Sequence, residues 1–106
     1  MLKTLILALA AVLAARAAPA GDLAQGRVLA KRCAACHGID GLATMPMAPN
    51  IAGHSDIYLV KQLRAFRSGE RQNQMMSVVA GPLTDAEIDD LAAWYSAIEV
   101  EVTLPE

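Results

Sequence analysis

The sequence predicts an all-α domain built from three main helices and irregular loops. Three stretches combine a good helix N-cap residue with apolar residues at helical spacing. The segment of residues 38–53, between the first two stretches, is rich in glycine and proline, which interrupt helices. A second segment, residues 70–82, is predicted to be irregular and ends in Gly81-Pro82. No strand pattern and no internal repeat is found in the sequence.

The first 20 residues are predicted to be a signal peptide that precedes this domain. Lys3 gives the start of the chain a positive charge, and residues 5–15 form an unbroken apolar run. Residues 18–20 offer small side chains at the positions that a signal peptidase reads. We therefore expect cleavage after Ala20, with cleavage after Ala17 as the next choice.

A membrane anchor is the alternative interpretation of the leader. The apolar run is short for a bilayer, and Arg16 ends it. We expect residues 21–106 to form one exported domain that is periplasmic and has no stable membrane insertion once the leader is removed. Export and the lack of a basic patch both argue against a nucleic-acid partner.

The expected mature chain is acidic and poor in large side chains. Without the two basic residues of the leader, seven basic residues face eleven acidic ones, a net charge of −4. Only four aromatic residues remain in a domain of roughly 85 residues, which is a marginal core by itself. A buried apolar cofactor would supply the missing core volume.

Residues 22–33 are predicted to form the first helix. Asp22 is a suitable N-cap, and Leu23, Val28 and Leu29 are expected to face inward. Gly26 is unfavourable inside a helix, so its presence predicts a close crossing with another helix at that position.

The sequence Cys33-Ala34-Ala35-Cys36-His37 predicts one covalently attached haem c. Residues three apart share a face of a helical turn, so each thiol can add to one haem vinyl group while His37 ligates the iron. A thioredoxin-like pair would need a βαβ context, and a disulfide across so short a loop would stabilise little. A closed zinc site needs four ligands, and His54, the only other histidine, is distant.

Residues 38–53 are predicted to be a loop, because glycines and prolines recur through them. The segment is nevertheless apolar enough to cover a haem. Residues 54–69 are predicted to form the second main helix, with Ser55 as N-cap and Gly69 at its C-terminal end. The apolar stripe of this helix consists of Leu59, Leu63 and Phe66.

Residues 70–82 are predicted to be irregular, and the last main helix begins after them. Thr84 and Glu87 have the spacing of a capping box. The apolar stripe of this helix consists of Ile88, Leu91, Ala92 and Tyr95.

A haem that transfers electrons needs a second axial ligand on the face opposite His37. Methionines within residues 38–53 follow His37 too closely to reach that face easily, whereas Met75 and Met76 come after a full helix. A thioether suits reduced iron, and His/Met ligation raises the reduction potential relative to His alone. The residues alone leave Met75, Met76 and His54 as candidates, and core filling is the other role of a methionine.

Several motifs of the mature chain share their spacing with a known family. Gly26 stands seven residues before Cys33, and Met76 stands seven before Leu83. The chain thereby resembles class I cytochrome c, most closely the bacterial c-4 and c-553 group, over nearly its whole mature length. The other matching segments are Cys33-Ala34-Ala35-Cys36-His37-Gly38, Pro49-Asn50-Ile51-Ala52-Gly53-His54, Tyr58, Lys61-Gln62-Leu63, Phe66-Arg67-Ser68-Gly69-Glu70-Arg71 and Leu91-Ala92-Ala93-Trp94-Tyr95.

The resemblance implies a class I cytochrome c fold wrapped around one haem. It implies Met76 rather than Met75 as the second axial ligand. It also implies that the backbone carbonyl of Pro49 accepts a hydrogen bond from Nδ1–H of His37, which orients the ring and raises its basicity.

The same resemblance implies that Gly26 meets Trp94 or Tyr95 where the first and last helices cross. His54 departs from the family pattern, which has glutamine at that position. The c-4 proteins fuse two such domains, so we expect a c-553-like monomer or one domain of a partnered assembly.

We expect a one-electron carrier without substrate chemistry of its own. Its expected partners are donor and acceptor redox proteins, with a membrane oxidase or a dehydrogenase as candidates. The alternative is a haem c electron-transfer subunit of a larger dehydrogenase or oxidase. A haem enzyme or gas sensor would need an open sixth position and distal acid–base groups, and His54 is the only further imidazole. Electrons are expected to leave through a haem edge near Cys36, bordered by the apolar residues 45–48.

Overall fold

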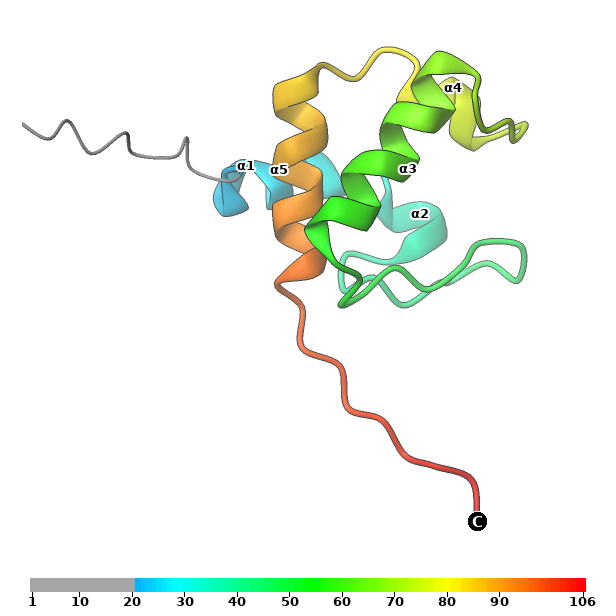
Figure 1. Ribbon diagram of the computed structural model, residues 1–106. Helices are drawn as coiled ribbons and strands as arrows, with labels where there is room; N and C mark the ends of the chain where they lie inside the picture. The colour runs from blue at the N-terminus through cyan, green and yellow to red at the C-terminus, as the bar shows by residue number, and fades with distance from the viewer. Residues whose placement is uncertain (1–20) are drawn as a thin grey trace, which may run out of the picture.

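The computed structural model describes residues 21–106, which form five α-helices joined by turns and loops (Figure 1). The predicted leader, residues 1–20, lies outside the described residues. No strand is found in the described range, and the predicted all-α class is confirmed. The helices are α1 (Leu23–Ala30), α2 (Ala34–His37), α3 (Asp56–Ser68), α4 (Met76–Ala80) and α5 (Asp85–Ser96).

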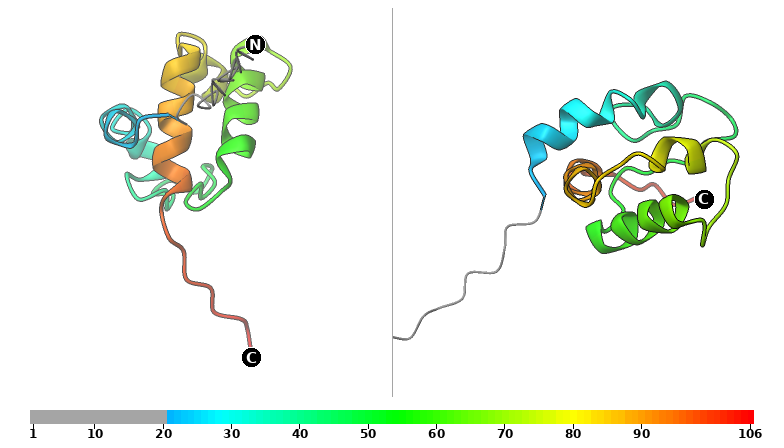
Figure 2. Two further views of the ribbon diagram at one scale, coloured as in Figure 1. Left: turned by 60° about the vertical axis from the view of Figure 1, so that its left-hand side comes forward. Right: turned by 90° about the horizontal axis from the view of Figure 1, so that it is seen from above.

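The other helices are arranged around α5. It crosses α1 and packs beside α3, and α4 packs against α3 (Figures 1 and 2). The three main helices of the prediction are therefore α1, α3 and α5. Within residues 21–106, no helix is long and apolar enough to cross a membrane.

The predicted capping box sets the start of α5. The hydroxyl of Thr84 accepts a hydrogen bond from the Glu87 amide, and the Glu87 carboxylate accepts one from the Thr84 amide, both at 3.1 Å. These bonds satisfy amides that would otherwise have no partner at a helix start. The predicted apolar stripe of α5 is buried in the core, and its members are Ile88, Leu91, Ala92 and Tyr95.

Gly26 lies where α1 crosses α5, as its place in the sequence predicts. It is buried, and a side chain there would overlap the carbonyl oxygen of Asp90 and lie 2.9 Å from Cβ of Trp94. Only glycine therefore allows the two backbones to approach this closely. Of the two aromatic partners expected from the resemblance, Trp94 is the one in contact.

Of the three residues of the first helix predicted to face inward, Leu29 packs against the core, and the prediction is wrong for the other two. Leu23 and Val28 are 49% and 55% exposed, whereas Gly26 and Ala30 are buried. The crossing is so close that it is made by the small residues four apart, and the larger side chains lie off that face. The helix also ends at Ala30, before the predicted boundary at Cys33.

The caps predicted for the second main helix are present in α3. The Ser55 hydroxyl accepts a hydrogen bond from the Tyr58 amide at 3.2 Å. Gly69 ends the helix in the left-handed conformation with φ of 86°, which glycine adopts without strain. Leu59 and Phe66 are buried, and Leu63 packs against them.

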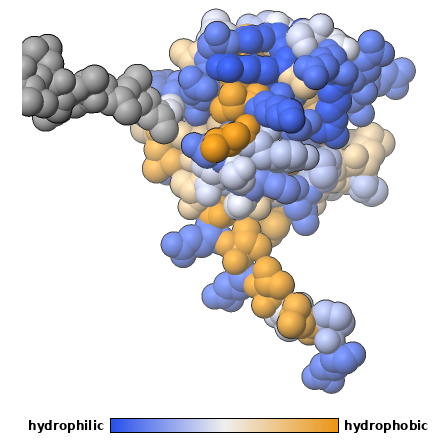
Figure 3. All heavy atoms as spheres, in the orientation of Figure 1, coloured by the Kyte–Doolittle hydropathy of each residue, from blue (hydrophilic) through white to orange (hydrophobic). Residues whose placement is uncertain are grey.

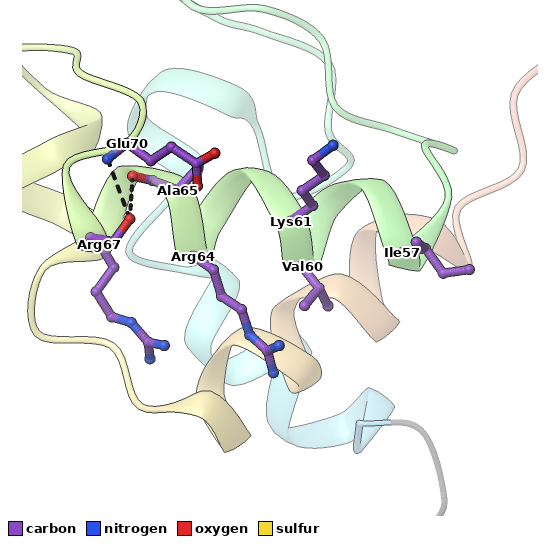
Figure 4. Close-up of a pocket in the computed structure, with 8 residues that line it drawn as sticks. Ile57, Val60, Lys61, Arg64, Ala65, Arg67 and Glu70 are labelled. Carbon is purple, nitrogen blue, oxygen red and sulfur yellow. Dashed lines mark hydrogen bonds between the residues drawn. The ribbon is translucent and has the colours of Figure 1, made fainter.

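A shallow surface groove runs along the outer face of α3, and two arginines extend from it toward the start of α5 (Figure 4). Arg67 donates hydrogen bonds to the Asp85 carboxylate at 2.6 Å and to the Leu83 carbonyl at 3.0 Å. Arg64 lies 3.9 Å from the same carboxylate. These contacts tie the end of α3 to the turn that precedes α5.

Residues 99–106 leave α5 as an extended segment (Figure 1). Its apolar residues form a visible band along the segment in Figure 3. Val102 and Leu104 are each 78% exposed, whereas Val100 lies beside Gly53.

We predict that Gly26→Ala destabilises the fold by about 1–3 kcal/mol, because the new methyl group must push α1 away from α5. Chemical denaturation followed by circular dichroism measures this loss. Gly81→Ala is the matched control and should cost less, because its new Cβ would make a tight contact of 3.2 Å with the Ser77 carbonyl oxygen and would not overlap it. Equal stability of the two variants would contradict the close crossing.

We also predict that the ion pair of Asp85 contributes stability that is lost in acid. The hydrogen bond from Arg67 lowers the pKa of the Asp85 carboxyl below its ordinary value of 3.8. The contribution is therefore complete above about pH 4 and is lost as the pH falls through the lowered pKa. The difference in Tm between wild type and Asp85→Asn should narrow in that range, whereas Glu99→Gln should show no such trend. A difference that does not depend on pH would disprove this.

Candidate haem site

The two cysteines and the histidine of the motif lie on one helical turn. The amides of Cys36 and His37 donate to the Cys33 carbonyl at 3.3 and 2.9 Å. Both thiols are free and partly buried, and His37 is only 7% exposed. Burial raises the pKa of the Cys33 thiol above its ordinary value. The turn thus presents two thiols and one imidazole from a short segment at the side of α5.

A hydrogen bond to the backbone orients the His37 ring. Nδ1 of His37 lies 2.8 Å from the carbonyl oxygen of Pro49. A carbonyl only accepts hydrogen bonds, so Nδ1 carries the proton and Nε2 keeps its lone pair. A ring held in this tautomer is prepared to ligate a metal through Nε2.

The loop of residues 38–53 brings Pro49 back to His37 through its own backbone bonds. The carbonyl of Gly41 accepts from the amides of Ile51 and Ala52 at 2.8 and 3.1 Å. The Thr44 amide donates to the Cys36 carbonyl at 3.0 Å. Gly41 has φ of 75°, and a side chain on it would collide with Ala52, so glycine is required at this crossing of the loop.

Two aromatic residues of α5 hold the start of the same loop. The hydroxyl of Tyr95 donates to the Gly38 carbonyl at 3.0 Å, and the indole of Trp94 donates to the Ile39 carbonyl at 2.9 Å. Burial raises the pKa of the Tyr95 hydroxyl, so it stays protonated as a donor. The residue after His37 is therefore anchored to the central helix.

The two adjacent methionines have different environments. Met76 is partly buried and packs against the core, whereas Met75 is 58% exposed. In the loop, Met45 has its sulfur 3.5 Å from that of Cys36, and Met47 is 78% exposed. Of the residues 45–48 predicted to border the haem edge, Met45 is the one with a contact to Cys36.

His54 lies apart from the hydrogen bonds of the motif. It is exposed, and its ring stacks on that of Tyr58 with centroids 5.2 Å apart. Arg71 donates a hydrogen bond to the Gln62 side chain at 2.7 Å, and its guanidinium lies over the Phe66 ring.

The donor set fits a covalently bound haem. Two unpaired thiols on one turn can form two thioether bonds, and the free Nε2 of His37 is an iron ligand. No group of three or more His, Cys, Asp or Glu residues suited to a metal ion is found in residues 21–106, which leaves this motif without a competing ion site in that range.

The family model for cytochrome c matches residues 23–97, which include the whole motif and all five helices. This chain belongs to the cytochrome c family. Its cofactor is haem c, bound covalently through Cys33 and Cys36, and it is an electron-transfer protein and not an enzyme. The predicted class I fold is confirmed.

Three relatives show where this cytochrome lies within the family. It is 41% identical to cytochrome c-554(548) of Halomonas halodenitrificans, over 76% of this chain and 100% of that protein. The structure of cytochrome c4 from Pseudomonas stutzeri matches with a TM-score of 0.71 and 34% identity, over 78% of this chain and 48% of that one. A thiosulfate dehydrogenase from Marichromatium purpuratum matches with a TM-score of 0.69 and 33% identity, over 74% of this chain and 19% of that one. This cytochrome therefore spans about half the length of the c4 proteins that it matches.

Sequence reasoning missed three features of the site. It did not find the donors Tyr95 and Trp94, because they lie 57 and 55 residues from the carbonyls that they bind. It also missed α4, which falls in the segment predicted to be irregular. The one local indication of a helix start there is Asn73, a good N-cap residue that is followed by three good helix formers, residues 74–76.

We predict that Tyr95→Phe destabilises the haem-loaded protein by about 1–3 kcal/mol, because the buried Gly38 carbonyl loses its donor. Denaturant unfolding followed by the haem absorbance measures the loss. Tyr58→Phe is the matched control, since Tyr58 is 45% exposed. If both variants lose the same stability, the anchoring role of Tyr95 is wrong.

Proposed function

We propose that this cytochrome is a periplasmic one-electron carrier whose haem is ligated by His37 and Met76. The observation that carries the proposal is the hydrogen bond between Nδ1 of His37 and the Pro49 carbonyl, which leaves Nε2 for iron. The burial of Met76 against the core supports it as the opposite ligand. A haem c with both axial positions filled supplies a one-electron couple and no open position for a substrate.

The residues around His37 support electron transfer by holding this ligand in a fixed position. The Pro49 carbonyl fixes the ring orientation of His37 and raises the basicity of Nε2. Tyr95 and Trp94 hold the backbone that follows His37. Each of these bonds limits how far the ligand can move when the charge of the site changes, which keeps reorganisation small.

The proposed partners are redox proteins that dock transiently near Cys36. Exposed Met45 and Met47 offer an apolar rim there, which suits a small interface. Periplasmic location rests on the leader predicted at residues 1–20, and without that leader the net charge is −4. A net acidic charge biases association toward basic partner surfaces.

A second candidate role is a permanent electron-transfer subunit of a larger dehydrogenase. The similarity to part of a thiosulfate dehydrogenase structure favours it. The same haem ligation would serve both roles, so they differ only in the interface. A subunit would co-purify from its host with a larger protein, whereas a carrier would not.

We predict that Met76→Ala opens the iron to added ligands. The ferrous wild type should bind carbon monoxide poorly, and the variant should bind it at least on the order of tenfold more tightly, equivalent to about 1.4 kcal/mol. The ferric variant should also lose the far-red methionine–iron absorption band. Met75→Ala is the matched control and should behave as wild type.

The opposite pattern would show that the ligand assignment is wrong. If Met75→Ala opens the iron and Met76→Ala does not, Met75 is the ligand. If wild type binds carbon monoxide as readily as Met76→Ala, the electron-carrier proposal itself fails in favour of an open site.

A further inference from the structure

Two consecutive methionines compete for one position in this site. Successive residues of a helix point about 100° apart, so a backbone that turns Met76 inward turns Met75 away. The observed exposure follows this rule, because Met76 packs against the core and Met75 is 58% exposed. Met75 carries the same thioether as Met76 and could ligate iron equally well. A structural feature must therefore fix the rotation of this turn.

The helix itself is too short to fix its own rotation. α4 has five residues, little more than one turn, and helices of this length are unstable without added contacts. α4 packs against α3, Ala80 is buried in the core, and a set of hydrogen bonds lies at its N-terminal end, beside the two methionines. Gln74, in the same turn, is exposed and has no part in the hydrogen bonds found there.

Asn73 and Ser77 close that end with four hydrogen bonds. The side-chain oxygen of Asn73 accepts from the amides of Met75 and Met76, at 2.9 and 3.0 Å. The Asn73 amide donates to the Ser77 hydroxyl at 3.1 Å, and the Ser77 amide donates to the Asn73 carbonyl at 3.0 Å. Met75, at the N-cap position of α4, has no side-chain cap of its own. The four bonds made by Asn73 and Ser77, here called the cap, hold the amides of both methionines at one oxygen atom.

We propose that Asn73 and Ser77 are positioning residues that select Met76 over Met75 as the axial ligand. This inference rests on the proposed function, because it takes Met76 to be the ligand. The cap sets the backbone rotation of the turn, and the rotation determines which thioether faces the core. Neither residue needs to touch the haem for this role.

The test uses the haem-loaded full chain and imidazole as a competing ligand of ferric iron. In Asn73→Ala the uncapped turn should release Met76 more easily, so imidazole should bind about tenfold more tightly, equivalent to about 1.4 kcal/mol. Binding is followed by the loss of the methionine–iron absorption band. Ser77→Ala should change the affinity in the same direction by a smaller factor, since it removes one of the four bonds.

Two further variants separate selection from general stability. Asn73→Asp keeps an oxygen that accepts from both amides, so it should bind imidazole within about threefold of wild type. Gln74→Ala alters the same turn without touching the cap and should leave the affinity unchanged. Loss of stability without a change in imidazole affinity would overturn the proposal.

The methionine–iron absorption band also reports which of the two methionines ligates the iron. Met76→Ala alone should lack the methionine–iron band, because the cap keeps Met75 turned away. Adding Asn73→Ala should restore part of that band through Met75, and a further Met75→Ala should abolish it again. If the band never returns when the cap is removed, the cap does not select the ligand. Should Asn73→Ala fail to fold, Ser77→Ala takes its place in the same comparison.

The same variants separate a wrong ligand assignment from a wrong role of the cap. If Met76→Ala leaves imidazole affinity unchanged, Met76 is not the ligand and both proposals fail. If Met76→Ala raises the affinity but neither cap variant does, the ligand assignment stands and only the selection by Asn73 and Ser77 is overturned.

Discussion

The rest of the site depends on the hydrogen bond between His37 and the Pro49 carbonyl. An imidazole has two nitrogens, and a metal ligand must have the correct one deprotonated and aimed outward. The bond of 2.8 Å fixes both properties, but only if the chain returns to within reach twelve residues later. The loop of residues 38–53 therefore has to close on itself, and the left-handed Gly41 and the paired amides of Ile51 and Ala52 are how it does so.

The central helix α5 joins the haem motif to the rest of the fold. One end of its buried face packs the core around Ile88, and the other end carries the donors Trp94 and Tyr95, which hold the backbone after His37. Its close crossing with α1 at Gly26 fixes the approach of the chain to Cys33. The same helix therefore packs the core and holds the backbone beside the haem motif, so a change in the position of α5 affects both.

The side of the site that carries Met76 is held by weaker means. α4 is a single short turn on α3, and its start depends on the cap made by Asn73 and Ser77. The loop that holds His37 is large and closed, whereas the cap beside Met76 is small. More structure must therefore break to release His37 than to release Met76. With the proposed His37/Met76 ligation, ligand exchange would begin at Met76, because fewer contacts have to break there.

The sequence by itself determined what depends on neighbours a few residues apart. The haem motif, the caps of α3 and α5 and their apolar stripes all follow from spacing within one or two helical turns, and all are present. The tertiary structure alone decided which face of α1 is buried, because the closeness of the crossing at Gly26 excludes Leu23 and Val28 from it. It also decided which carbonyls Trp94 and Tyr95 bind and how α4 begins. Contacts that span 55 residues or more carry no local pattern, since only the folded path of the chain brings their partners together.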